Sequence, residues 1–84
     1  PLAPLALFKK AQLLFVLAKY QASMVEFEKL KEIAPDEATV HFLLAQLYKI
    51  LQRKSDAVKE FTIALNLDPK GSHIIKEAME TLNE

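Results

Sequence analysis

Two prolines place the strongest constraint on how this chain can fold, because each ends a stretch of helix-forming residues. Proline lacks a backbone N–H and disfavours the helical conformation in the residue before it. A helix must therefore end just before Pro35, and another just before Pro69. Pro69 lies 34 positions after Pro35. This spacing suggests that the chain repeats a unit of that length.

Shifting the sequence by the same 34 positions supports a repeat. Seven further pairs of identical residues then coincide: Phe8 and Phe42, Ala11 and Ala45, Gln12 and Gln46, Leu13 and Leu47, Leu17 and Leu51, Glu26 and Glu60, and Phe27 and Phe61. Self-similarity at this period is typical of a helix–turn–helix solenoid.

The composition favours helices and gives the chain no general attraction to nucleic acid. The 84 residues carry 11 basic and 11 acidic side chains, so the net charge favours neither nucleic acid nor an anionic membrane as a partner. One glycine and four prolines leave little material for hairpin turns. Without cysteine, the chain has no disulfide and no thiolate metal site. We expect a single all-α domain.

Apolar stripes and cap residues divide each unit into two helices. The expected domain covers residues 1–84, as repeat one (4–37), repeat two (38–71) and a C-terminal capping helix (72–84). Periodicity predicts helices over 4–17 and 22–33 in repeat one, 37–51 and from 55 onward in repeat two, and 72–83 in the cap. The predicted N-cap residues of the last three helices are Asp36, Ser55 and Ser72. The sequence thus predicts an α-α superhelix of two repeats and a cap.

Small and aromatic residues stand where the helices of a solenoid must pack. A methyl group at a crossing lets two helix axes approach to about 8–9 Å. Alanines expected at such crossings are Ala11, Ala45, Ala57 and Ala64. Phe27 and Phe61 are expected to fill the space between neighbouring units.

The second unit resembles the tetratricopeptide repeat, a helix pair with a small residue at position 8, an aromatic residue at position 24 and proline at position 32. Numbered from Ala38, it supplies the expected types at Leu44, Ala45, Tyr48, Ala57, Phe61, Ala64 and Pro69. His41 stands where the repeat usually has a bulky residue. The first unit keeps Ala11, Phe27 and Pro35 but departs at Lys10, Leu14, Ser23 and Leu30, so it resembles a degenerate copy.

Four longer strings resemble one branch of this family. They are PLALFKKAQLLF, KYQAS, LKEIAPDEATVHFLLAQLYK and ALNLDPKGSHIIKEA. They are similar to the last repeats of the cell-division-cycle protein 27 family, the large tetratricopeptide subunit of the anaphase-promoting complex. The resemblance implies a nuclear or cytoplasmic scaffold in a ubiquitin ligase that drives mitotic exit. It also implies that the repeats bind other subunits or short peptide tails, and that the chain is part of a longer superhelix.

Four side chains are the candidates for partner binding. Phe8, Gln12, Phe42 and Gln46 recur at the repeat step and are expected to line a concave strip for an extended peptide or a partner helix. Repeats that hold acidic chaperone tails have lysine and asparagine at these places. A carboxylate would here meet rings and amides, with no cation to offset its desolvation. The alternative is that the four side chains only pack within the stack.

The run from Leu13 to Ala18 is apolar on every side, although it stands in the first helix of the stack. A helix of this kind is normally covered all round, and an exposed apolar patch usually marks an interface. Self-association through Phe15 and Val16, giving a homo-oligomer, would cover it, and so would a neighbouring repeat. A further interpretation is an engineered or fragmentary repeat that self-associates and has no native activity. A signal peptide is disfavoured because the repeat register runs through the segment.

No arrangement of residues suggests catalysis. His41 and His73 are the only imidazoles, and neither has a second histidine four residues away, as the zinc-binding helix motif requires. Ser72 precedes His73 on one helix, where adjacent side chains point apart. We therefore predict that the chain is not an enzyme and needs no cofactor or metal.

The charged stretch EFEKLKE, residues 26–32, predicts ion pairs on the surface. Glu26–Lys29 and Glu28–Lys31 have the i, i+3 spacing, at which a pair contributes only about 0.2–0.5 kcal/mol. We expect these charges to form a solvated face and not a site.

Overall fold

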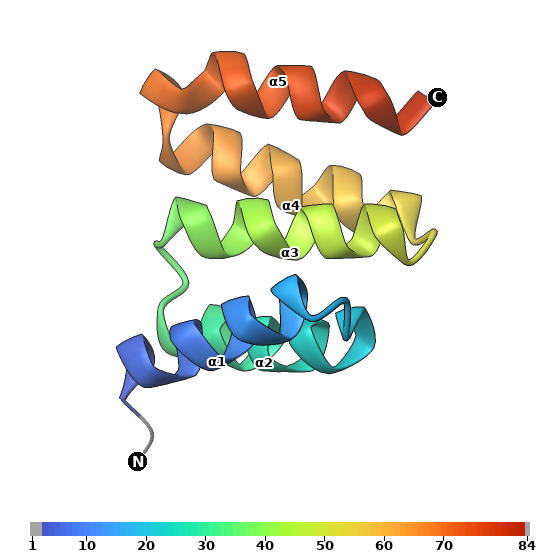
Figure 1. The fold of residues 1–84 in the computed structure, drawn as a ribbon. Helices are drawn as coiled ribbons and strands as arrows, with labels where there is room; N and C mark the ends of the chain where they lie inside the picture. The colour runs from blue at the N-terminus through green and yellow to red at the C-terminus, as the bar shows by residue number, and fades with distance from the viewer. Residues whose placement is uncertain (1–2, 84) are drawn as a thin grey trace.

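A computed structural model describes residues 3–83, without the side chain of residue 83. Five α-helices and two short 3-10 helices make up this range (Figure 1). The elements are α1 (Pro4–Val16), α2 (Tyr20–Ile33), α3 (Ala38–Ile50), α4 (Lys54–Leu67), η1 (Pro69–Gly71), α5 (Ser72–Glu80) and η2 (Thr81–Asn83). The described residues contain no strand, which confirms the all-α class.

The helices form two hairpins that stack along one direction and end in α5 (Figure 1). α1 packs against α2, and α3 packs against α4. The hairpins meet because α2 also packs on α3, and α5 then packs on α4. This is the α-α solenoid that the repeat predicted.

The helices end where the prolines predicted, but the predicted caps are wrong. α2 stops at Ile33 and α4 at Leu67, before Pro35 and Pro69. None of the three predicted residues occupies the N-cap position: these positions in α3, α4 and α5 are Glu37, Arg53 and Gly71, and none makes a side-chain cap hydrogen bond. Most helical stability in a folded protein comes from packing, so these helices begin without the caps predicted at Asp36, Ser55 and Ser72.

Aromatic rings and alanines fill the centre of each hairpin. Phe27 and Phe61 are fully buried. Each ring meets the edge of another ring in its own hairpin, Phe8 at a centroid distance of 5.9 Å and Phe42 at 5.7 Å. Phe27 also borders a small hollow with Leu43 of the next hairpin. The alanines predicted at helix crossings are fully buried as well: Ala11, Ala45, Ala57 and Ala64.

The two hairpin turns share a backbone conformation that usually requires glycine. Ala18, between α1 and α2, has a φ of 61°, and Gln52, between α3 and α4, has a φ of 65°. Both lie in the left-handed region, where a Cβ is unfavourable. The same bond closes both turns, because the N–H of the next residue donates to the carbonyl of Leu14 at 2.9 Å or of Tyr48 at 2.7 Å. Neither turn contains glycine, so the glycine content of the sequence did not indicate that these two residues have a positive φ.

Replacing Gln52 by glycine should stabilise the domain. Glycine avoids the steric cost of about 1–2 kcal/mol that a side chain meets at positive φ, although its freedom in the unfolded chain offsets part of this gain. We expect a net gain of about 0.5 kcal/mol in urea unfolding. Gln12→Gly, in the exposed part of α1, is the matched control and should lose about 1 kcal/mol. A loss for Gln52→Gly would contradict the argument from backbone strain.

Candidate protein-interaction site

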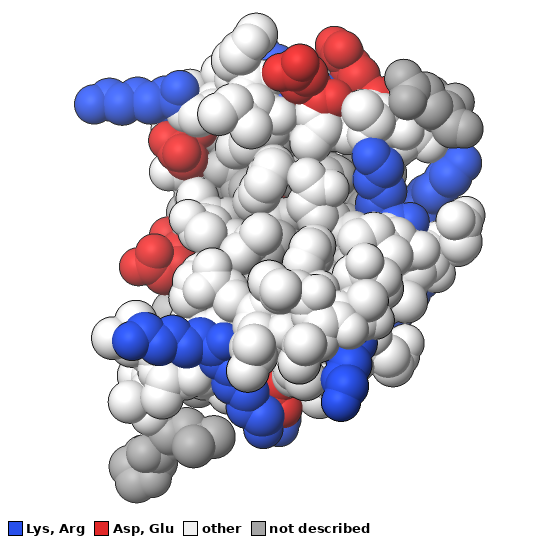
Figure 2. All heavy atoms as spheres, viewed as in Figure 1, with Lys and Arg blue, Asp and Glu red and all other residues white. Residues whose placement is uncertain are grey.

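The predicted partner-binding side chains lie on α1 and α3, where shallow hollows separate them. Phe8 borders a hollow of about 390 Å³, Phe42 one of about 220 Å³ and Gln12 one of about 110 Å³. Gln46 is half-buried on α3. In the view of Figures 1 and 2, uncharged side chains fill the middle of the face, and charged ones lie towards its margin. The strip is thus a row of apolar hollows and not one continuous groove.

The two larger hollows occupy equivalent places in successive repeats. The first is bordered by Pro4, Leu5, Phe8, Ala34, Glu37 and Val40, and the second by Ala38, Thr39, Phe42, Asp68, Gly71 and Ile74, each one repeat step later. Thr39 borders both hollows. The surface therefore offers an apolar hollow twice, at equivalent places in the two repeats but of different size.

The second hollow has an acidic wall that the backbone holds in place. Asp68 Oδ1 accepts a hydrogen bond from the Gly71 N–H at 3.1 Å. A Cβ at position 71 would lie 2.5 Å from Asp68 Oδ2. A side chain at position 71 would therefore displace the Asp68 carboxylate, whereas the backbone φ of −89° is open to any residue. The first hollow has Ala34 at the place of Asp68 but Glu37 at the place of Gly71, so one acidic residue borders each hollow, at a different position.

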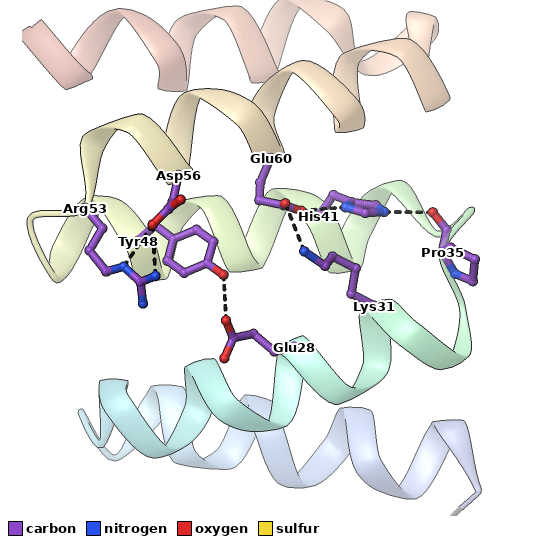
Figure 3. A network of polar contacts seen from close by, with 8 residues as sticks. All are labelled: Glu28, Lys31, Pro35, His41, Tyr48, Arg53, Asp56 and Glu60. Atoms are coloured by element: carbon purple, nitrogen blue, oxygen red, sulfur yellow. Dashed lines mark hydrogen bonds and ion pairs between the residues drawn. The ribbon is translucent and has the colours of Figure 1, made fainter.

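A buried polar network joins α2, α3 and α4 (Figure 3). Glu60 points from α4 towards His41 and Lys31, with Oε1 at 2.7 Å from His41 Nδ1 and Oε2 at 3.2 Å from Lys31 Nζ. His41 Nε2 lies 2.7 Å from the Pro35 carbonyl oxygen. Because a carbonyl only accepts, Nε2 is the donor in this bond, and one proton is shared between Nδ1 and Glu60 Oε1. These contacts link α2, the α2–α3 connection, α3 and α4.

A second group of contacts joins α2 to the α3–α4 turn (Figure 3). The Tyr48 hydroxyl donates to Glu28 Oε2 at 2.8 Å. The Arg53 guanidinium lies 4.7 Å from the centre of the Tyr48 ring and is held by Asp56, with distances of 3.0 and 2.9 Å. Burial raises the pKa of the Tyr48 hydroxyl well above its usual value, the bond to Glu28 and the charge of Glu28 raise it further, and the Arg53 charge opposes the shift.

The expectation of a wholly solvated charged stretch is wrong. Glu26 is buried, and Lys31 pairs with Glu60 of the next hairpin and not with Glu28. The sequence held one signal for this, because Glu26 and Glu60 coincide at the repeat step as do the core residues Ala11, Ala45, Phe27 and Phe61. A charged residue that recurs with the core residues was a candidate for a buried, paired position.

The two residues predicted for self-association differ in exposure. Val16 is 80% exposed, whereas Phe15 is half-buried with its ring at 5.6 Å from that of Tyr20. Only Val16 is therefore open to a partner without rearrangement. His73 is exposed on α5, with Nε2 at 3.9 Å from Glu77 Oε2.

Neither a metal centre nor a membrane span is present in the part of the chain that the structure describes. Residues 3–83 contain no group of three or more His, Cys, Asp or Glu side chains placed to hold a metal ion. The apolar stretches of the helices in this range fall short of what crossing a bilayer requires.

Comparison with known proteins agrees with the repeat geometry. Residues 38–70 match the family model described as tetratricopeptide repeat. The chain belongs to the tetratricopeptide-repeat family. The match covers repeat two, in which the buried Ala45, Ala57 and Phe61 occupy the positions that define the repeat.

The relatives of this tetratricopeptide-repeat chain include subunits of one assembly. The chain is 54% identical over 79 residues to anaphase-promoting complex subunit 3 of Schizosaccharomyces pombe, which is 94% of the chain and 12% of the relative. It is 40% identical over 73 residues to cell division cycle protein 27 homolog A of Arabidopsis thaliana, which is 87% of the chain and 10% of the relative. Protein bimA of Emericella nidulans is 58% identical over 45 residues, or 54% of the chain and 6% of the relative. The chain thus spans about an eighth or less of these proteins.

Repeat one lies outside the residues that match the tetratricopeptide model. A hydrogen bond compensates for one of the positions at which it departs from the repeat pattern. Ser23 stands where the repeat has a small apolar residue, as Ala57 does in repeat two. The buried Ser23 Oγ donates to the Ala11 carbonyl at 2.7 Å. The hydroxyl is therefore satisfied at the helix crossing, and the degenerate repeat keeps its packing.

A double-mutant cycle should show that His41 and Glu60 stabilise the domain together. His41→Leu and Glu60→Leu should each lower the free energy of unfolding by about 1–3 kcal/mol, because each leaves a buried polar group without its partner. We expect a coupling free energy of about 1 kcal/mol or more from urea unfolding. The exposed pair His73 and Glu77, each changed to Leu, is the matched control and should show coupling near zero. Equal coupling in the two cycles would contradict a structural role for the buried pair.

The raised pKa of Tyr48 should be visible in a spectroscopic titration. Tyr20→Phe leaves Tyr48 as the only tyrosine, and its absorbance should change above the usual midpoint of about pH 10. Because folding raises this pKa, the contribution of Tyr48 to stability is present below about pH 10 and is lost as the pH rises further. Adding Glu28→Gln should move the absorbance change towards the usual pH. A midpoint at the usual value before that change would contradict the assigned contacts.

Proposed function

We propose that the chain is a protein-interaction scaffold segment of an anaphase-promoting complex, without catalytic activity of its own. The observation that carries the proposal is its similarity over 94% of its length to a subunit 3 of that complex. In this role the segment would help to hold together a ubiquitin ligase of mitotic exit, in the nucleus or cytoplasm. The geometry supports the scaffold role because the two hairpins form one stacked unit with hollows on its face.

The proposed binding surface is the strip with Phe8, Gln12, Phe42 and Gln46. Apolar side chains border both larger hollows, and the amide of Gln12 is exposed beside them. Such a surface suits an extended peptide tail or a subunit that places apolar side chains in successive hollows while the amides bind its backbone. The partner is thus a protein, with no nucleic acid, membrane or cofactor involved.

The absence of catalysis in this proposal follows from the positions of the two imidazoles. His41 has both ring nitrogens engaged in the buried network, and His73 stands on the surface beside Glu77. Neither lies beside a hydroxyl nucleophile in a described hydrogen bond, as general-base catalysis would need. In the same proposal, repeat one spans 4–37, repeat two spans 38–71 and the cap begins at residue 72; residue 84, where the expected cap ends, lies outside the described residues.

Self-association as the main function, for a natural or engineered chain, is the weaker candidate. The exposure of Val16 favours it. However, α1 contains no acidic residue, so the α1 face of a second copy would offer no carboxylate to pair with Lys9 and Lys10.

The proposed strip can be tested by measuring how the chain binds fission-yeast anaphase-promoting complex prepared without its subunit 3. Gln12→Glu combined with Gln46→Glu should weaken binding at least about 10-fold, because a partner that covers the strip would desolvate two unpaired carboxylates. Gln21→Glu with Gln52→Glu, on α2 and the second turn, is the matched control and should leave binding unchanged. The proposal fails if the unmodified chain does not bind, and the strip is wrong if both variants bind as the unmodified chain does.

A further inference from the structure

One buried histidine connects the interior of the stack to the wall of the first hollow. His41 is 3% exposed on α3, and its Nε2 lies 2.7 Å from the Pro35 carbonyl oxygen. Pro35 lies in the α2–α3 connection between Ala34 and Glu37, which both border the hollow beside Phe8. Among residues 3–83, no other hydrogen bond reaches the Pro35 carbonyl. The imidazole therefore holds this wall of the first hollow in place.

The two hydrogen bonds of His41 require both of its ring nitrogens to donate. A carbonyl oxygen only accepts, so Nε2 carries a proton in the bond to Pro35. Nδ1 lies 2.7 Å from Glu60 Oε1, and the Lys31 ammonium, 3.2 Å from Glu60 Oε2, favours the ionised form of this carboxylate. An ionised carboxylate only accepts, so Nδ1 must donate as well. His41 makes both bonds at once only as the positively charged imidazolium.

The charged groups around His41 come from the two helices that pack on α3 (Figure 3). α4 contributes Glu60, whose side chain is only 3% exposed. α2 contributes Lys31 and also Glu28, which accepts the hydrogen bond of the Tyr48 hydroxyl. The pKa of Tyr48 is raised well above its usual value, so this hydroxyl stays neutral near pH 7. The proton on His41 is therefore the one that this network is able to lose near neutral pH.

Loss of one proton forces His41 to give up one of its two hydrogen bonds, because a neutral imidazole has a single N–H. The bond to Glu60 is buried and charge-assisted, whereas the bond to Pro35 is only partly buried and joins a neutral carbonyl. Charge-assisted hydrogen bonds are roughly twice as strong as neutral ones. The remaining proton therefore stays on Nδ1, and water replaces the imidazole at the Pro35 carbonyl.

The second hollow is held by a different contact. Ile75 stands one repeat step after His41 and is 5% exposed, so an aliphatic side chain fills the place of the ring. The equivalent wall is fixed by the Gly71 N–H, which donates to Asp68 Oδ1 at 3.1 Å. A change in the protonation of His41 should therefore alter the first hollow and leave the second unchanged.

We propose that His41 is a pH-dependent switch that controls the shape of the first hollow. In the imidazolium form, the ring binds both Glu60 and the Pro35 carbonyl, and the α2–α3 connection is held against α3. When the pH rises and the ring loses a proton, the bond to Pro35 breaks and the wall formed by Ala34 and Glu37 is released. A use of this switch in regulating partner binding rests on the proposed function of the strip, whereas the switch itself does not.

The switch can be tested by NMR spectroscopy on the chain with His73→Gln. His73 is exposed, and its removal leaves His41 as the only imidazole. Isotope-labelled histidine and proline are followed from about pH 5 to about pH 9, which includes the usual charge change of histidine. We expect both ring nitrogens to be protonated at the lower pH and Nδ1 alone at the higher. The Pro35 carbonyl resonance should shift with the same midpoint, and the amide resonance of Gly71 should not.

Glu60→Gln in the same chain provides the matched comparison. An amide can donate to Nδ1 of a neutral ring while its oxygen still accepts from Lys31. The neutral ring then keeps its Nε2 proton and its bond to Pro35, so the Pro35 carbonyl resonance should stay constant over the whole pH range. Circular dichroism checks that this variant folds, and the measurement of the ring nitrogens with Glu60 in place stands without it.

Three results would overturn the proposal. The first is a ring whose protonation does not change over the pH range, and the second is a neutral ring that keeps its proton on Nε2 although Glu60 is present. The third is a Pro35 carbonyl resonance that shifts equally with Glu60 and with Gln at that position. No partner protein takes part in the experiment, so its failure would leave the proposed function of the strip standing, and failure of the binding test would leave the switch standing.

Discussion

The packing of α2 on α3 joins the two hairpins, and both apolar and polar groups take part in it. On the apolar side, Val40 and Leu47 of α3 are buried where α2 covers them. On the polar side, Lys31 and Glu28 of α2 reach Glu60 and Tyr48 of the second hairpin. Apolar contact supplies most of the stabilisation in such an interface, and the directed bonds fix how the two hairpins are aligned. The hollow beside Phe8 depends on this alignment, because residues of α1, α2 and α3 border it.

The fold could be predicted from the sequence because its main determinants are periodic. The repeat step placed Phe27 and Phe61 in the core, and the prolines marked two helix ends, as the structure confirms. The cap residues could not be predicted in the same way. A serine such as Ser55 can cap a helix, but whether it does depends on where the preceding turn ends. The left-handed residues Ala18 and Gln52 set that point, and nothing in their side chains indicates it.

The candidate site was predictable only in part, because sequence spacing does not reveal contacts between distant segments. The prediction that Phe8 and Phe42 lie on helices was correct. The hollows beside them could not be predicted, because each depends on how three helices converge. The bonds of Glu60 join residues 19 and 29 positions away in the chain. Such a network forms only after the hairpins stack. The recurrence of glutamate at the repeat step indicated that Glu60 belongs to this network, but it did not indicate the residues that bind Glu60.

Thr39 forms a wall common to the two larger hollows. A single amino-acid change at this position would alter the shape of both at once, whereas a change at Phe8 or Ile74 would alter only one. Any protein that fills both hollows therefore meets the Thr39 side chain at two of its own positions, and both positions must fit it. Natural variation at residue 39 should accordingly be narrower than at other exposed positions of α3, and it should vary together with the two matching residues of such a protein.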